Sequence, residues 1–182
     1  WALESGRVED AARIADGLWW FWGLRAHWGR GLERLRALDP HLERLPLELR
    51  VRILTGSCYL EMESGDWKRS LEAGDRALPL ARALGDPKRL VKALIYWANS
   101  HAHLASEFDG AHAAYDEGLA IAERIGDGWG MGWLLLNKGW VRRFEGLPEE
   151  GLEHLSRSLE HFGRQGSPTG IAWATTGIGL TH

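Results

Sequence analysis

The sequence lacks several features on which common classes of protein depend. Among its 182 residues only Cys58 is a cysteine, which excludes an internal disulfide and a metal site built from several cysteines. Apolar runs fall short of the roughly eighteen residues of a membrane-spanning helix, and the first residues do not resemble a secretory leader. With 22 Lys and Arg against 25 Asp and Glu, no basic excess attracts nucleic acid. We therefore expect a cytoplasmic protein that contacts neither membranes nor nucleic acid directly.

Strand-forming patterns are scarce as well. β-branched residues are few, and no segment sustains the alternation of apolar and polar residues that marks a half-buried strand. The sequence is instead rich in tryptophan and glycine, with 11 and 23 residues respectively. Because glycine disfavours a helix and tryptophan needs packed surroundings, the spacing of these residues decides the fold.

That spacing reveals a repeat of about 40 residues. Segments that begin at Gly6, Leu45, Gly85, Gly126 and Gly166 lie 39, 40, 41 and 40 residues apart. The thirteenth residue after each start is small in four of five cases: Trp19, Cys58, Ala98, Gly139 and Gly179. A second segment opens at the twenty-second residue, or at the twenty-third in the third unit: Trp28, Trp67, Phe108 and Pro148. Each unit is therefore expected to contain two amphipathic helices of about sixteen to twenty residues.

Turn-like sequences separate these helices at regular places. "SGDW" at 64–67, "EFDG" at 107–110 and "GLPE" at 146–149 lie within units, whereas "LGDP" at 84–87, "IGDG" at 125–128 and "QGSP" at 165–168 close them. The pattern predicts an all-α solenoid that forms a single domain over residues 1–182. Its units are expected near 6–44, 45–84, 85–125 and 126–165, with a partial unit at 166–182.

The repeat also assigns roles to the glycines. Gly139 and Gly179 occupy the small position, where close crossing of two helices leaves no room for a side chain. Gly126 and Gly166 stand at helix ends, where a left-handed residue commonly terminates a helix. The glycine-rich stretch "GDGWGMGWLLLNKGW" at 126–140 is therefore expected to form a helix.

The helix pair, its "SGDW" turn ending at Trp67 and the "SEFDGA" sequence around Phe108 resemble a tetratricopeptide repeat. The 40-residue length resembles the long repeats of bacterial signal-transduction ATPases and of transcriptional regulators related to the maltose activator. "WALESGRVEDAARIADGLWWFWGLRAHWGRGLERL" is similar to the segment that follows the ATPase and winged-helix part of such proteins. The resemblance implies a right-handed superhelical solenoid of antiparallel helix pairs, with about four and a half repeats. Because the chain starts at Trp1 and stops inside an apolar segment, we expect a piece of a longer protein.

In repeat solenoids the first helices line the concave face, where ligands usually bind. Two rows of residues are expected there: Arg13, Arg52, Lys92, Trp133 and Trp173, then Trp20, Tyr59, Asn99 and Trp140, with Arg143 a turn further along. Between them lie Asp16, Thr55, Ile95, Leu136 and Thr176. The groove would be cationic in its first three units and aromatic in its last two. Because Arg52 is expected to face solvent, reversing its charge should leave the fold intact.

Purely structural interpretations compete with this one. Trp133, Trp140 and Trp173 could be buried between neighbouring units, and Arg13, Arg52 and Lys92 could form a solvated stripe paired with nearby acids. Trp19 and Trp22 are expected to cover the open end of the stack.

No pattern indicates catalysis, a metal or a cofactor. His101 and His103 lie two residues apart and so point in different directions on a helix, Cys58 is expected to be buried and inert, and "GDGWGMG" lacks the lysine of a nucleotide loop. We therefore expect a non-catalytic module, which the resemblance implies is the sensor or scaffold region of a bacterial regulator. Its partner would be a protein or peptide segment, or a small effector with acidic and apolar parts. The alternatives are an oligomerisation scaffold that self-associates through the repeat ends, and an accessory domain that orients a substrate for an enzyme.

Overall fold

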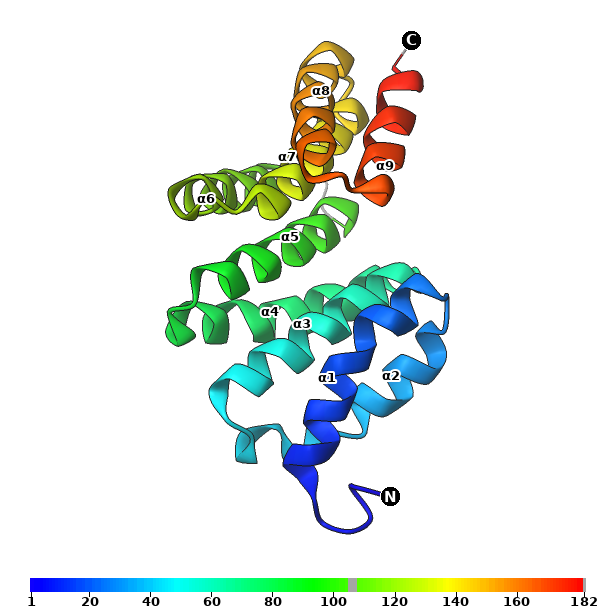
Figure 1. Cartoon of the computed structure of the whole chain (residues 1–182), viewed down its shortest axis with the longest axis vertical. Coiled ribbons are helices and arrows are strands. Elements are labelled where there is room, and N and C mark those ends of the chain that lie inside the picture. Colours follow the sequence, from blue (N-terminus) through cyan, green and yellow to red (C-terminus); the bar gives the residue numbers. More distant parts are fainter. Residues whose placement is uncertain (105–107, 182) are drawn as a thin grey trace. The chain divides into compact units, whose positions relative to one another are not determined.

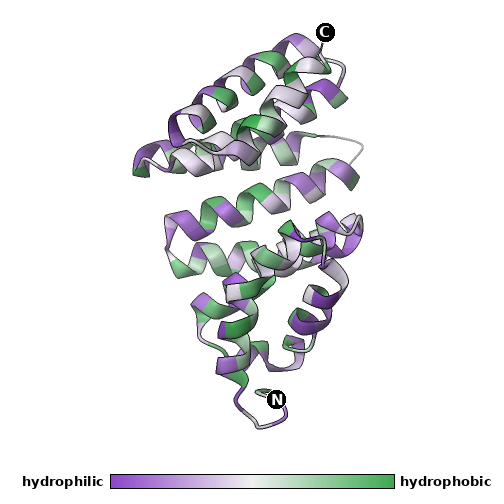
Figure 2. Cartoon of the chain, turned by 45° about the vertical axis from the view of Figure 1, so that its right-hand side comes forward, coloured by the Kyte–Doolittle hydropathy of each residue, from purple (hydrophilic) through white to green (hydrophobic). Residues whose placement is uncertain are grey.

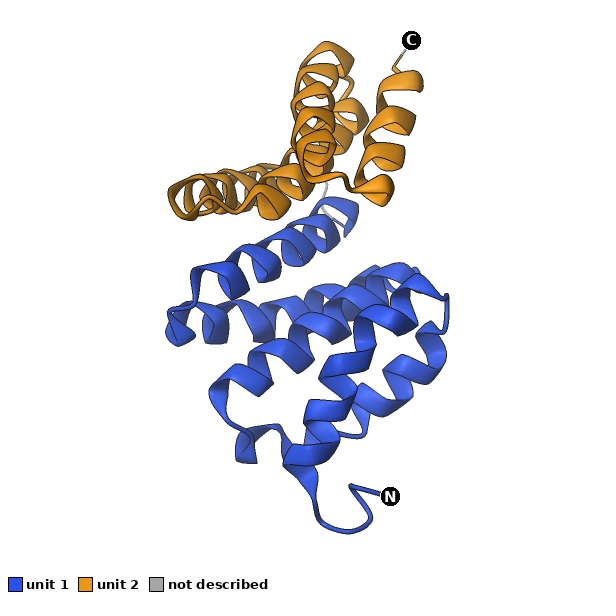
Figure 3. Ribbon diagram, viewed as in Figure 1, with its two compact units in different colours: residues 1–104 blue, residues 105–182 orange. Residues whose placement is uncertain are grey.

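The computed structural model describes residues 1–104 and 108–181, and over these ranges the chain is helical without β-strands (Figure 1). The chain forms two compact units, residues 1–104 (unit 1) and 105–182 (unit 2), which we describe separately (Figure 3). Most helices carry both polar and apolar residues (Figure 2). The all-α prediction is confirmed, whereas the superhelical solenoid and the single domain stay predictions. None of the helices described is both long and apolar enough to cross a membrane.

Consecutive helices pack against each other within each unit. Unit 1 contains α1 (Val8–Leu24), α2 (Trp28–Arg36), the 3₁₀ helix η1 (Asp39–Arg44), α3 (Leu47–Glu63), α4 (Trp67–Leu84) and α5 (Pro87–Leu104). Unit 2 contains α6 (Asp109–Ile125), α7 (Gly128–Phe144), α8 (Pro148–Gln165) and α9 (Pro168–Gly179).

The predicted turns begin and end these helices. Gly85, Gly126 and Gly166 have φ angles of 72°, 66° and 60°, the left-handed conformation expected after a helix. The acid or serine that follows caps the next helix: the carboxylate of Asp127 accepts a hydrogen bond from the Gly130 amide at 3.1 Å, and the hydroxyl of Ser167 accepts one from the Gly170 amide at 3.4 Å. Glu107, the first residue of the turn predicted at 107–110, lies outside the described residues. The stretch 128–140 is helical, as predicted.

One predicted helix is much shorter than expected. The second helix of the first repeat ends at Arg36 after nine residues, and η1 follows it. Pro40 contributes to the break, because its ring would clash with the Arg36 carbonyl and it has no N–H to donate, although α4 continues through Pro79. The segment still packs inward, since Leu38 and Leu42 are buried.

In the fourth repeat, the small residue in the middle of the first helix lies where two helices cross closely. A β-carbon added at Gly139 of α7 would lie 2.8 Å from Leu155 Cγ and 2.9 Å from the carbonyl oxygen of Gly151, both in α8. Gly179 has no described atom within 4 Å of such a β-carbon, so the crossing predicted there is wrong for the described residues. It is the last residue of α9, and no described side chain reaches it.

Cys58 occupies the same repeat position in α3 and is buried, as predicted. Its Sγ lies 3.4 Å from Ser70 Oγ of α4, and the Ser70 hydroxyl donates to the Cys58 carbonyl at 2.6 Å. Burial raises the pKa of the thiol to about 11, so the thiol stays protonated at neutral pH. These contacts make Cys58 a packing residue.

The outward face of α1 is apolar, and no described residue covers it. Its exposed side chains include Ile14, Leu18, Phe21 and Leu24. A β-carbon at Gly17, in the middle of this face, would meet no described atom within 4 Å. The equivalent face of α3, 39 residues later, is buried: it contains Ile53, Gly56 and Leu60, and Gly56 packs against the Trp19 ring. The same repeat face therefore forms a helix–helix interface in α3 and an open surface in α1.

Candidate functional site

Unit 1 contains six of the predicted groove residues, on its three first helices. Arg13 and Trp20 lie on α1, Arg52 and Tyr59 on α3, and Lys92 and Asn99 on α5. Because α1 packs on α3 and α3 packs on α5, these helices place a charged row and an aromatic row along one face. The residues between the two rows are buried rather than exposed: Asp16, Thr55 and Ile95.

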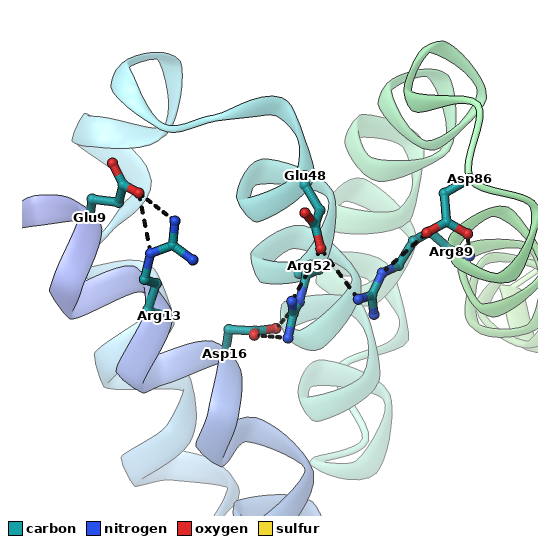
Figure 4. A network of polar contacts seen from close by, with 7 residues as sticks. All are labelled: Glu9, Arg13, Asp16, Glu48, Arg52, Asp86 and Arg89. Atoms are coloured by element: carbon teal, nitrogen blue, oxygen red, sulfur yellow. Dashed lines mark hydrogen bonds and ion pairs between the residues drawn. The ribbon is translucent and has the colours of Figure 1, made fainter.

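The charged row is a network of alternating acids and bases (Figure 4). Arg52 contacts both carboxylate oxygens of Asp16, and its Nε donates to Asp16 Oδ1 at 2.8 Å. Another Arg52 nitrogen lies 3.2 Å from Glu48 Oε1, and a guanidinium nitrogen of Arg89 in α5 lies 3.4 Å from the same oxygen. Arg89 Nε also lies 3.8 Å from Asp86 Oδ2. The network thus links all three first helices.

This network corrects two expectations. The row is not a cationic ladder, because each of its two predicted arginines is paired: Arg13 bonds Glu9 at 2.6 Å, and Arg52 bonds Asp16 and Glu48. The expectation that Arg52 faces solvent without a structural role is also wrong, since the Asp16 side chain that it neutralises is only 6% exposed. The competing structural interpretation, a stripe of basic residues paired with nearby acids, describes Arg13 and Arg52.

Sequence reasoning missed Glu48 and Arg89. The spacing of Glu48 and Arg52, four residues apart, is the helical signal that could have identified this pair. Arg89 could not be found in this way, because its contact with Glu48 joins residues 41 positions apart.

The two rings of the aromatic row in unit 1, Trp20 and Tyr59, belong to a packed cluster of four rings that also contains Trp19 and Tyr96. Trp20 stacks on Tyr59 with ring centroids 5.2 Å apart, and Tyr59 lies 5.1 Å from Tyr96. Trp19 meets Tyr59 edge-on at 5.5 Å, and Lys92 Nζ lies 5.7 Å from the centre of the Trp19 ring. Tyr59 is buried, and burial raises its pKa. Trp20 keeps 36% of its surface exposed.

The prediction that Trp19 and Trp22 cover an open end is wrong. Trp19 packs between α1 and α3 against Gly56, and Trp22 packs against Gly31 of α2. Both rings are buried inside unit 1, because glycines on the facing helices leave room for them.

A small depression lies beside the charged row. Its enclosed volume is about 20 Å³, room for about one water molecule. Seven residues of the three first helices line it: Asp16, Trp19, Val51, Arg52, Thr55, Arg89 and Lys92. The hydroxyl of Thr55 is buried there and has no hydrogen-bond partner among the described residues.

Unit 2 contains the other four predicted residues. Trp133 and Trp140 of α7 are partly buried against a core of Leu136, Leu155, Phe162 and Ala174. Much of the surface of these two rings is therefore packed, as the purely structural interpretation expected. Trp173 of α9 is 54% exposed. The Arg143 guanidinium lies 4.9 Å from the centre of the Trp140 ring and donates to the Leu180 carbonyl at 2.7 Å. Trp140 and Arg143 thus form a local pair, and a groove shared with unit 1 stays a prediction.

The histidines considered as metal ligands have other contacts. His101 lies 4.9 Å from Trp97, and His103 stacks on Trp67 with centroids 3.6 Å apart. Among the residues that the structure describes, no group of three His, Cys, Asp or Glu side chains could hold a metal ion.

The sequence is similar to three proteins named "Putative HTH-type transcriptional regulator". One is from Mycobacterium bovis, and two are from strains of Mycobacterium tuberculosis. Each is 28% identical over 151 residues, which cover 76% of this chain and 16% of the relative. The chain therefore spans about a sixth of the length of these relatives. No family model matches the chain.

Proposed function

We propose that this chain is a non-catalytic binding module of a cytoplasmic transcriptional regulator, built from long tetratricopeptide-like repeats. It would hold a peptide or a segment of a partner protein on the first-helix face of unit 1. The observation that carries the proposal is the arrangement of α1, α3 and α5, which places a charged row, a depression and an aromatic row on one face. The similarity to relatives named as regulators supports the regulatory context.

Trp20 is the residue of this face best placed to contact a partner. It combines an exposed edge with a ring held in place by Tyr59 and Trp19, so little side-chain freedom would be lost on binding. Rigid aromatic side chains beside charged groups are typical of energetically dominant contacts in interfaces. The paired charges around Arg52 would set the orientation of a polar partner more than its affinity.

The test uses peptides selected from a random displayed library on the immobilised chain, then synthesised and titrated. We expect Trp20→Ala to weaken binding of a selected peptide by about tenfold or more. The matched control is Trp1→Ala, since Trp1 is an exposed tryptophan outside this face. The proposal fails if Trp20→Ala keeps its melting temperature and binds every selected peptide as tightly as the unchanged chain does.

The apolar face of α1 favours a second candidate function, an oligomerisation scaffold. The occupant would be a second copy of this chain, packed along Ile14, Leu18 and Phe21. Gly17 lies at the centre of this face and would allow two α1 helices to approach closely. The equivalent face of α3 already serves as a helix-packing surface, which supports this use of the repeat.

For this candidate we expect the chain to sediment as a dimer and Phe21→Asp to make it monomeric, because a buried carboxylate without a partner opposes association. The control is Phe144→Asp, which changes another exposed phenylalanine, in unit 2. Sedimentation velocity over a range of concentrations measures the oligomeric state of the unchanged chain and of both variants. A chain that is monomeric throughout, or a Phe21→Asp variant that still dimerises, rules out this use of α1.

A further inference from the structure

The apolar face of α1 has a charged residue at each end. Residues at successive spacings of four, three, four and four form one stripe along this face: Asp10, Ile14, Gly17, Phe21 and Arg25, the last of which is the C-cap residue of α1. Such spacing places all of them on the same side of a helix. The opposite side of α1 is buried inside unit 1. The stripe is therefore available to another molecule over its whole length.

The stripe is nearly symmetric about Gly17 in its positions and opposite in its charges. Ile14 lies three residues before Gly17 and Phe21 lies four residues after it, while Asp10 and Arg25 lie seven residues before and eight residues after. At 1.5 Å per residue, the two charged residues are roughly 10–12 Å from the centre on either side. Each half of the stripe thus presents an apolar side chain and then a charge, which is negative in one half and positive in the other.

Both charged side chains can accept a contact from outside. Arg25 is exposed, and its side chain forms no ion pair within the part of the chain that the structure describes. Asp10 is bonded to Arg7 at 2.7 Å, but 46% of its side chain stays exposed. A carboxylate has room for several donors, and an exposed ion pair contributes little to stability. Asp10 can therefore bind a second arginine without losing its present partner.

A second copy of the chain presents the complementary stripe when the two α1 helices run antiparallel. A two-fold axis near Gly17 then brings Ile14 of each copy to Phe21 of the other, and Asp10 of each copy to Arg25 of the other. Parallel helices would instead place like charges opposite each other at both ends, which opposes association. Gly17 leaves space at the crossing, since no described atom lies within 4 Å of an added β-carbon. The charges and the glycine both favour the antiparallel pair.

We propose that two copies of this chain pair antiparallel through α1, with Gly17 at the two-fold axis and a reciprocal Asp10–Arg25 ion pair at each end. The inference rests on the second candidate function, because it assigns a geometry to the self-association proposed there. One helix face per copy is small for an interface, so the pair forms reversibly as concentration rises. A two-fold pair also closes on itself, so association stops at the dimer.

Exchanging the charges between the two ends tests this geometry. Asp10→Arg and Arg25→Asp should each weaken dimerisation by about tenfold, because the two-fold axis makes each substitution replace two attractive contacts by two repulsive ones. The two substitutions combined in one chain should restore dimerisation, since opposite charges again face each other. In a parallel pair, neither the single variants nor the combined variant would differ much from the unchanged chain. Sedimentation velocity gives the dissociation constants, and melting curves show that the variants are folded.

The control for net charge is Arg157→Asp, which makes the same change on an exposed arginine of α8 in unit 2. It should leave the dissociation constant of the dimer unchanged. A loss of dimerisation as large as that of Arg25→Asp would mean that net charge, rather than a contact at Arg25, controls association.

Cross-linking measures the orientation independently. Ile14→Cys and Phe21→Cys are prepared as separate proteins and oxidised mildly, alone and mixed. We expect the mixture to form a disulfide-linked pair containing one copy of each variant, identified by its mass, and neither variant to link efficiently to itself. Cys58 does not interfere, because it is buried and its thiol stays protonated.

Two results would overturn the antiparallel pair: a combined charge variant that dimerises no better than the single variants, or cross-linking of each cysteine variant mainly with itself. Failure of the broader function has a different signature. If the chain stays monomeric up to its highest soluble concentration, or if Phe21→Asp still dimerises, self-association through α1 is wrong and the inference is wrong with it. If Phe21→Asp is monomeric but exchanging the charges has no effect, α1 is the interface and only the antiparallel arrangement is wrong.

Discussion

Arg52→Glu is expected to destabilise unit 1 by about 2–4 kcal/mol, because it leaves the nearly buried Asp16 carboxylate facing a second negative charge. Breaking a fully buried ion pair costs roughly 3–5 kcal/mol, and the partial exposure of Arg52 reduces that cost. Urea denaturation followed by circular dichroism measures the change in the free energy of unfolding. The simple view of Arg52 as a solvent-facing residue predicts almost no change.

The matched control is Arg13→Glu, at the equivalent repeat position of α1, 39 residues earlier. The Arg13–Glu9 pair is exposed on both sides, so its loss should cost less than about 1 kcal/mol. The double variant Asp16→Asn with Arg52→Gln should recover part of the stability, since it removes the buried charge along with its partner. Equal effects of Arg13→Glu and Arg52→Glu, or no recovery in the double variant, would contradict the structural role of the Asp16–Arg52 pair.

Gly139→Leu is expected to destabilise unit 2 by about 1–3 kcal/mol or more through overpacking. The added β-carbon alone would lie 2.9 Å from the Gly151 carbonyl oxygen, and a backbone atom cannot rotate away as a side chain can. Gly151 is equally constrained, since a β-carbon there would lie 2.8 Å from the Gly139 carbonyl oxygen. The two glycines therefore allow α7 and α8 to cross with their backbones in contact. Thermal melting gives the direction of the effect.

Helix propensity acts in the opposite direction and supplies the control. Gly163 of α8 also lies inside a helix but has no described atom within 4 Å of an added β-carbon, so Gly163→Ala should stabilise by up to about 1 kcal/mol. Gly139→Ala, with the same gain in propensity, should still be less stable than the unchanged chain. A raised melting temperature for both alanine variants would mean that α7 and α8 do not cross at Gly139.

The sequence by itself determined the helices, the turns between them and the small position at Gly139. These features depend on short-range chemistry: left-handed glycines such as Gly85 end a helix, and the acid or serine that follows caps the next one. The period of about 40 residues then aligned Cys58 with Gly139, which predicted two buried packing positions. The short α2 could have been predicted in the same way, because Pro40 acts on its own neighbours.

Only the tertiary structure decided which side chains of the first helices stay exposed. The residues between the two predicted rows are buried because α1, α3 and α5 pack side by side, which a helical wheel of one helix cannot show. The Asp16–Arg52 pair joins positions 36 apart, and Tyr59 is covered by rings from α1 and α5. A charge or an aromatic ring has no intrinsic exposure, because its neighbours in space determine whether it is paired, buried or free to bind. The candidate site therefore follows from the packing of three helices, whereas each helix follows from its own sequence.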